Sequence, residues 1–120
     1  MFLTLLPRYL VRGEGLAVGC VALAEYFHAG YPWWLLLALV LVPDFSLAGY
    51  LGGPRLGAAC YNAAHTYVVL LVLLAIGVVT GNDATTKVAL IWAVHIGFDR
   101  ALGYGLKYPD DFKHTHLQQL

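Results

Sequence analysis

Four long hydrophobic stretches, separated by short breaks that contain polar residues, glycine or proline, make up most of the chain. They cover approximately residues 13–31, 33–51, 56–80 and 84–103. The length of each stretch is similar to that of an α-helix that crosses a hydrocarbon core, which takes about 20 residues. Because the connections are only a few residues long, neighbouring helices must run antiparallel. The pattern predicts an all-α fold, in which residues 1–120 form one antiparallel bundle of four transmembrane helices.

Composition and charge agree with a membrane location. The chain has 120 residues, of which 60% are hydrophobic and 12% charged, too apolar for a small soluble domain. The positive side chains that fall on one side of a four-span arrangement are Arg8, Arg12, Arg55, Arg100, Lys107 and Lys113, and only Lys87 falls on the other. The positive-inside bias therefore predicts that both termini are cytoplasmic. Zero formal net charge and the absence of a basic stripe argue against nucleic acid as a partner.

Three of the stretches carry an ionisable side chain at the same expected depth. With a rise of about 1.5 Å per residue, Asp44, His65 and His95 each lie about 10–14 Å inward from the cytoplasmic boundary. An ionisable group at mid-membrane costs about 2.5–3.5 kcal/mol on insertion scales, so a convergence of several indicates a functional site. Asp99 and Asn62 fall about 5–9 Å deep, between that layer and the cytoplasm. These polar residues predict a pocket that opens to the inside.

Each of these residues also has a purely structural interpretation. Pro43 predicts a bend in the second helix, and Asp44 could repair the bend or pair with Arg55 or Arg100. His65 lies among small residues at positions 57–64 that favour close helix packing, and it could be a hydrogen-bonded packing residue. The spacing of His95 and Asp99 suits two metal ligands, or one ligand oriented by a carboxylate.

The C-terminal tail, residues 104–120, contains a further His-x-His pair, His114 and His116. Eleven residues can extend up to about 35 Å, enough to fold back over the cytoplasmic mouth of the pocket. The alternative is a solvated tail, or one that only packs its apolar residues against the bundle.

Imidazoles together with carboxylates favour a divalent metal such as zinc, iron or manganese. The predicted metal ligands are Asp44, His65, His95, Asp99, His114 and His116, and the predicted catalytic residues are Asp44, Asp99 and Asn62. Five histidines are few for a membrane di-iron oxygenase. The chain has no G-x-S-x-G turn and no phosphate-binding glycine motif. If the protein is an enzyme, a metal-activated water is the expected nucleophile, with Asp44 or Asp99 as the base.

Several motifs together resemble a known family. They include Arg12-Gly-Glu14-Gly15, Pro43-Asp44, Tyr61-Asn62-x-x-His65-Thr66-Tyr67, His95-x-Gly97-x-Asp99-Arg100 and Phe112-Lys113-x-Thr115-His116. Over nearly the whole chain the sequence is similar to the small bacterial membrane proteins grouped as domain of unknown function 4260. The resemblance implies a four-span protein of the bacterial inner membrane and no particular activity. Pro43-Asp44 and His65-Thr66 more distantly resemble the membrane-bound metal-dependent hydrolases, whose paired Asp and additional His-Ser elements are missing here.

Three functions are compatible with these features. The first is a metal-dependent, hydrolase-like membrane enzyme acting on a lipid or other small amphiphile from the cytoplasmic leaflet. The second is a b-type haem protein with His65 and His95 as the iron ligands. The third is a small proton-coupled transporter that uses Glu25, Asp44 or His95. The sequence leaves open the substrate, the metal and whether the bundle is a monomer or a homo-oligomer.

Overall fold

The computed structural model describes residues 2–106, with side chains from residue 7 onward. This part of the chain contains helices and no strands, which confirms the predicted all-α class. The elements are α1 (Phe2–His28), α2 (Trp33–Leu39), the 3₁₀ helix η1 (Val42–Gly52), α3 (Pro54–His65), α4 (Tyr67–Thr80) and α5 (Asp83–Leu102). Helix α1 thus begins earlier than the predicted residue 13, whereas α5 lies close to the predicted range 84–103.

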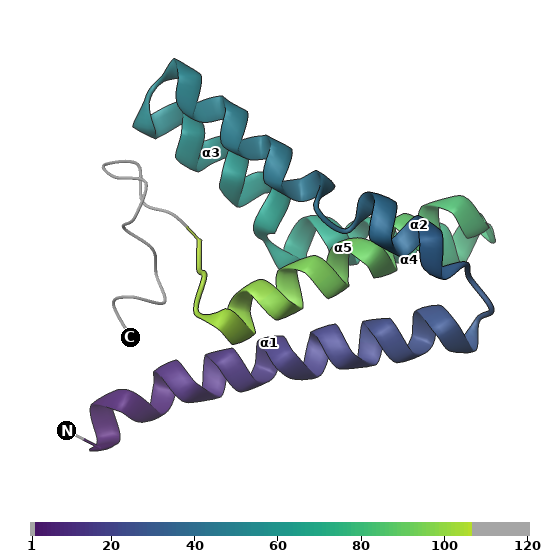
Figure 1. Cartoon of the computed structure of the whole chain (residues 1–120), viewed down its shortest axis with the longest axis horizontal. Coiled ribbons are helices and arrows are strands. Elements are labelled where there is room, and N and C mark those ends of the chain that lie inside the picture. The colour runs from purple at the N-terminus through teal and green to yellow at the C-terminus, as the bar shows by residue number, and fades with distance from the viewer. Residues whose placement is uncertain (1, 107–120) are drawn as a thin grey trace.

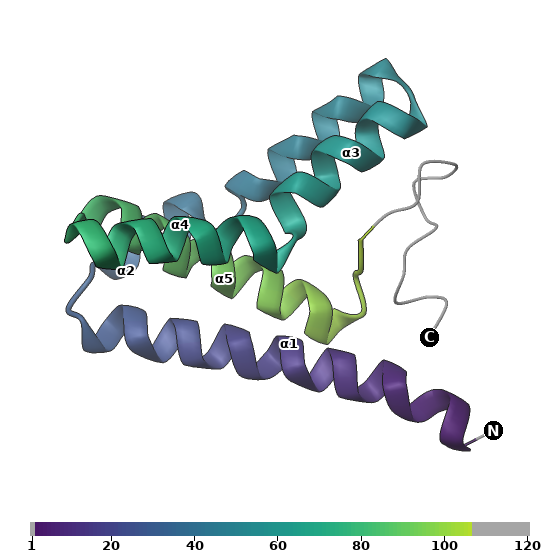
Figure 2. The same ribbon diagram turned by 180° about the vertical axis from the view of Figure 1, so that it is seen from behind.

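The helices form two parts (Figures 1 and 2). Helices α1 and α4 both pack along α5, while η1 and α3 form an antiparallel hairpin that leans away from α1. The apolar core lies mainly along α5, where Ile91 and Ile96 are fully or almost fully buried. The predicted ranges 33–51 and 56–80 are each interrupted, so the fold differs from four straight helices in a regular bundle.

Helices α1 and α5 approach closely because glycines face one another. A Cβ atom on Gly97 would lie 2.5 Å from the backbone nitrogen of Gly19 and 2.6 Å from the carbonyl oxygen of Gly15. Gly15 and Gly19 have the spacing of the small-residue motif through which membrane helices pack backbone to backbone. Arg12 adds a hydrogen bond, donated by its Nε to the carbonyl of Ala101 at 2.9 Å. Helix α5 is therefore held firmly on this side.

The first interruption lies between α2 and η1, at Val40 and Leu41. Pro43 has no N–H, so an α-helix cannot continue through it without losing a hydrogen bond. The chain instead tightens, and the N–H of Asp44 donates to the carbonyl of Leu41 at 3.0 Å. The eleven-residue 3₁₀ helix that follows is unusually long for this geometry. The bend expected from Pro43 is present, and it puts Asp44 in the first turn of η1.

The second interruption lies at Thr66, which is extended with φ −90° and ψ 142°. Its side chain accepts a hydrogen bond from the N–H of Val68 and so caps the start of α4. The axes of α3 and α4 differ in direction by 40°. His65 becomes the last residue of α3.

By length and composition, one helical segment among the described residues could cross a membrane, namely Trp33–Gly52, which joins α2 and η1. The bent pair α3 and α4 would be a second if it is one broken span.

Candidate functional site

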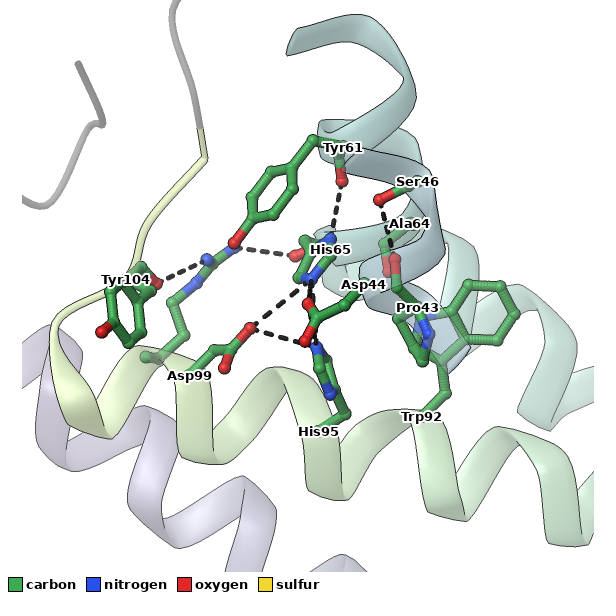
Figure 3. A network of polar contacts seen from close by, with 11 residues as sticks. Pro43, Asp44, Ser46, Tyr61, Ala64, His65, Trp92, His95, Asp99 and Tyr104 are labelled. Carbon is green, nitrogen blue, oxygen red and sulfur yellow. Dashed lines mark hydrogen bonds and ion pairs between the residues drawn. The ribbon is translucent and has the colours of Figure 1, made fainter. Parts of the chain in front are cut away.

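Asp44, His65, His95 and Asp99 meet where the η1–α3 hairpin diverges from α5 (Figure 3). Each side chain offers one ligand atom, and the four atoms all lie within 4.8 Å of one another. We refer to these four residues as the Asp/His cluster. Four of the six predicted metal ligands are thus brought together, from three separate elements.

The two interruptions create this meeting point. The bend at Pro43 starts η1 close to α5, and Asp44 lies in the first turn of η1. The break at Thr66 ends α3 at His65, beside the same part of α5. His95 and Asp99 then project from one face of α5, because residues four apart in an α-helix lie one above the other. Two breaks in apolar helices are therefore what allow the Asp/His cluster to form.

The distances within the cluster are short and nearly equal. The Nε2 atoms of His65 and His95 lie 3.1 Å apart, and each lies 3.1 Å from Oδ1 of Asp44. Oδ2 of Asp99 lies 3.1 Å from Nε2 of His95 and 3.5 Å from Nε2 of His65. A tetrahedral zinc ion with bonds of about 2.0–2.1 Å would place its ligand atoms about 3.3–3.4 Å apart. Five of the six distances between ligand atoms are therefore close to those of a tetrahedral metal shell, and the sixth, between the two carboxylate oxygens, is within 4.8 Å.

Hydrogen bonds orient both imidazoles. The Nδ1 atom of His65 lies 2.8 Å from the carbonyl oxygen of Tyr61, and the two rings stack with centroids 3.7 Å apart. A carbonyl only accepts hydrogen bonds, so Nδ1 of His65 carries a proton, and the ring in its neutral form presents the Nε2 lone pair to the cluster. The carbonyl of Val40 accepts a hydrogen bond from the His95 ring in the same way. Pro43 cannot donate to this carbonyl, which leaves it available. Metal-binding histidines are typically oriented in this way.

The resulting electrostatics favour a bound cation. Two imidazole lone pairs and two carboxylates converge, and the His65 and His95 side chains are 0% and 4% exposed. The Asp99 and Asp44 side chains are 20% and 40% exposed. Burying such groups without a compensating charge is costly. A metal ion or bound protons would supply that charge.

Arg100 is close by but does not pair with Asp44. It is buried, its Nη2 donates to the carbonyl of His65 at 2.9 Å, and its Nη1 donates to the carbonyl of Tyr104 at 3.1 Å. The carbonyl of Ala64 accepts a hydrogen bond from the indole nitrogen of Trp92. Both carbonyls lose their helical donors at the Thr66 break, so α5 replaces these hydrogen bonds with two of its own side chains. In the described residues, the ion-pair contacts of Asp44 are with the two histidines.

The remaining predicted site residues are Asn62, His114 and His116. Asn62 is partly buried on α3, three residues before His65. His114 and His116 lie outside the described residues. Sequence reasoning missed the roles of Trp92, Arg100 and Tyr61. The only signal that could have suggested these roles is spacing along the helices. Trp92 lies one turn from His95, Arg100 is next to Asp99, and Tyr61 lies one turn from His65.

The chain belongs to the family described as "Domain of unknown function (DUF4260)", whose family model matches residues 8–120. Neither the curated proteins nor the solved structures contain a match. The distant resemblance to membrane-bound metal-dependent hydrolases therefore depends on the sequence motifs alone.

Proposed function

We propose that this protein is a multi-pass protein of the bacterial inner membrane that binds a divalent metal, most favourably zinc, through the Asp/His cluster. Its proposed activity is metal-dependent hydrolysis of a lipid or other small amphiphile that enters from the cytoplasmic leaflet. The observation that carries the proposal is that five of the six distances among the ligand atoms of two histidines and two aspartates lie between 3.1 and 3.5 Å.

The membrane location is supported by the outer surface of the helices. Large apolar side chains are exposed on most elements, and Leu51 and Phe45 of η1 are 94% and 77% exposed. Soluble proteins rarely expose large continuous apolar surfaces. The proposed four-span arrangement goes beyond the one clear span, Trp33–Gly52: α1, the bent pair of α3 with α4, and α5 would each cross the bilayer as well. Both termini then lie on the side that carries most of the arginines and lysines, the cytoplasm.

Zinc fits these four ligands better than manganese does. It favours four ligands in tetrahedral geometry, whereas manganese favours six oxygen ligands. A catalytic zinc keeps three protein ligands and one open position for water. We assign His65, His95 and Asp99 as the three retained ligands. Asp44 is the more exposed of the two carboxylates, so it is the better candidate to move aside and accept a proton from the water. The metal would lower the pKa of a bound water, so that this water could act as a nucleophile at neutral pH.

The two alternatives receive less support. Iron bound by two histidines on opposite faces of a haem would hold their Nε2 atoms about 4 Å apart, with the macrocycle between them. Here these atoms lie 3.1 Å apart, and both carboxylates reach the same point. For the transporter, Glu25 lies exposed on α1, outside the cluster.

Elemental analysis of the purified full-length protein tests the proposal. We expect about one zinc per chain, loss of the metal in the double variant His65→Ala with His95→Ala, and full retention in His28→Ala, an exposed histidine of α1. A wild-type protein that binds no metal after exposure to zinc, iron and manganese would overturn the proposal. A Soret band after expression with ample haem would favour the haem protein instead.

A further inference from the structure

A pocket of about 350 Å³ adjoins the Asp/His cluster, between α2, η1, α3 and α5. Pro43 and Ala64, which precede Asp44 and His65 in the sequence, line it. Trp92 lines it as well, one turn before His95 on α5. In Figure 3, Pro43, Ala64 and Trp92 lie on one side of the cluster and Tyr104 lies on the other. The pocket is therefore a neighbour of the proposed metal centre.

The walls of this pocket offer an occupant almost only apolar surface. Leu39, Val42, Val88 and Ile91 contribute aliphatic side chains. Ser46 on η1 also lines the pocket, and its hydroxyl donates a hydrogen bond to the carbonyl of Pro43 at 2.7 Å. The indole nitrogen of Trp92 and the carbonyl of Ala64 bond each other. Because these polar groups already have partners, the pocket selects for a hydrocarbon.

The rim of the pocket is open to the surroundings of the protein. Val42 on η1 and Val88 on α5 are exposed as well as lining it. If the helices cross a bilayer, this rim faces lipid. The volume of the pocket is near the lower end of the range for small-molecule sites, about 300–1,000 Å³. A pocket of this size suits one alkyl chain rather than a bulky ligand.

We infer that this pocket holds the alkyl chain of the substrate, so that the polar group at the end of that chain is presented to the Asp/His cluster. The inference rests on the proposed function and narrows its substrate to an amphiphile with an alkyl chain joined to a metal-binding group, such as a carboxylate or an ester. The chain enters sideways past Val42 and Val88. Ile91 and Trp92 then contact the methylene groups next to the polar end.

Trp92 provides a direct probe of occupancy. The chain has three tryptophans, and Trp33 and Trp34 are exposed at the start of α2. Full-length protein with Trp33→Phe and Trp34→Phe, placed in phosphatidylcholine bilayers and loaded with zinc, fluoresces from Trp92 alone. Bromine quenches indole fluorescence on contact. We therefore titrate with dodecanoic acid brominated at mid-chain and with dodecane brominated at the same position.

We expect saturable quenching by the brominated acid, at a concentration roughly tenfold below that needed for the brominated alkane, a difference of about 1.4 kcal/mol in binding. Val88→Phe fills the pocket and should raise the half-quenching concentration of the acid roughly tenfold. Val79→Phe makes the same change at an exposed position of α4 that is not part of the pocket lining, and should leave it unchanged.

Equal quenching by acid and alkane, or quenching that does not saturate, would overturn the inference, because the bromine would then reach Trp92 only from the bilayer. The comparison of the two probes decides the matter even if Val88→Phe fails to fold. Zinc content measured in the same samples separates the two proposals. Bound zinc without saturable quenching overturns the pocket assignment alone. Saturable quenching that prefers the acid, in protein that binds no metal, supports the alkyl-chain site and overturns the metal-dependent function.

Discussion

Trp92 and Arg100 lie about two turns apart on α5 and donate hydrogen bonds to consecutive backbone carbonyls, those of Ala64 and His65 at the end of α3. Between these two anchors α5 presents His95 and Asp99. The same contacts that compensate the broken helix therefore fix the position of His65 relative to His95. Arg100 also lies over the ring of Tyr67, 5.5 Å from its centroid, on the other side of the break.

Replacing Arg100 tests this relationship. Arg100→Met leaves the buried carbonyl of His65 without its donor, a loss that typically costs about 1–3 kcal/mol. Because the bond positions a predicted ligand, we also expect zinc affinity to fall about 10–100-fold. Arg55→Met, at the exposed start of α3, is the control and should change neither quantity. Thermal unfolding in detergent and competition with a chelator measure the two effects. Unchanged affinity in Arg100→Met would show that the anchor does not position His65.

The glycine contact between α1 and α5 leads to a second prediction. Gly97→Ala forces its methyl group against the backbone of Gly15 and Gly19, so α1 and α5 must separate. Overpacking of this kind costs about 1–3 kcal/mol. Gly13→Ala introduces the same methyl group on α1, where a Cβ has no other atom within 4 Å, and should be neutral or slightly stabilising. Equal thermal stability of the two variants would contradict the close packing of α1 on α5.

The convergence of Asp44, His65 and His95 could be predicted from sequence because it depends only on position within each apolar stretch. Helical rise turns that position into depth, and Asp99 follows from the four-residue spacing. The bend near Asp44 was also predictable, since Pro43 removes a backbone donor whatever surrounds it. These features are local, and hydropathy together with helix geometry is enough to find them.

The break at Thr66 could not be predicted in the same way. Nothing in the residues around it forbids a continuous helix, and threonine is tolerated in helices. The break is stabilised by Trp92 and Arg100, which are distant in sequence and take over the freed carbonyls. The leaning η1–α3 hairpin follows from both breaks. A hydropathy pattern contains no information on such long-range compensation.

The two aspartates of the cluster should respond differently to amide substitution. In the proposed function Asp99 would hold the metal, whereas Asp44 would accept a proton from water. Asp99→Asn should therefore weaken zinc binding more than Asp44→Asn does, and Asp44→Asn should lose hydrolysis while it still binds zinc. Chelator competition gives the affinities, and release of product from a panel of single-chain esters gives the activity. If Asp44→Asn weakened zinc binding more than Asp99→Asn, Asp44 would be the retained ligand and Asp99 the base.

Metal removal should destabilise the fold, because the four ligands come from η1, α3 and α5 and a bound ion holds these elements together. A ligand that binds only the folded state stabilises it by about 2.7 kcal/mol at a free concentration one hundred times its Kd. We expect treatment with a chelator to lower the Tm of the wild-type protein, and added zinc to restore it. The double variant His65→Ala with His95→Ala should show neither response, whereas His28→Ala should behave as the wild type does. A wild-type Tm that is the same with chelator and with zinc would contradict the expectation that a bound metal holds η1, α3 and α5 together.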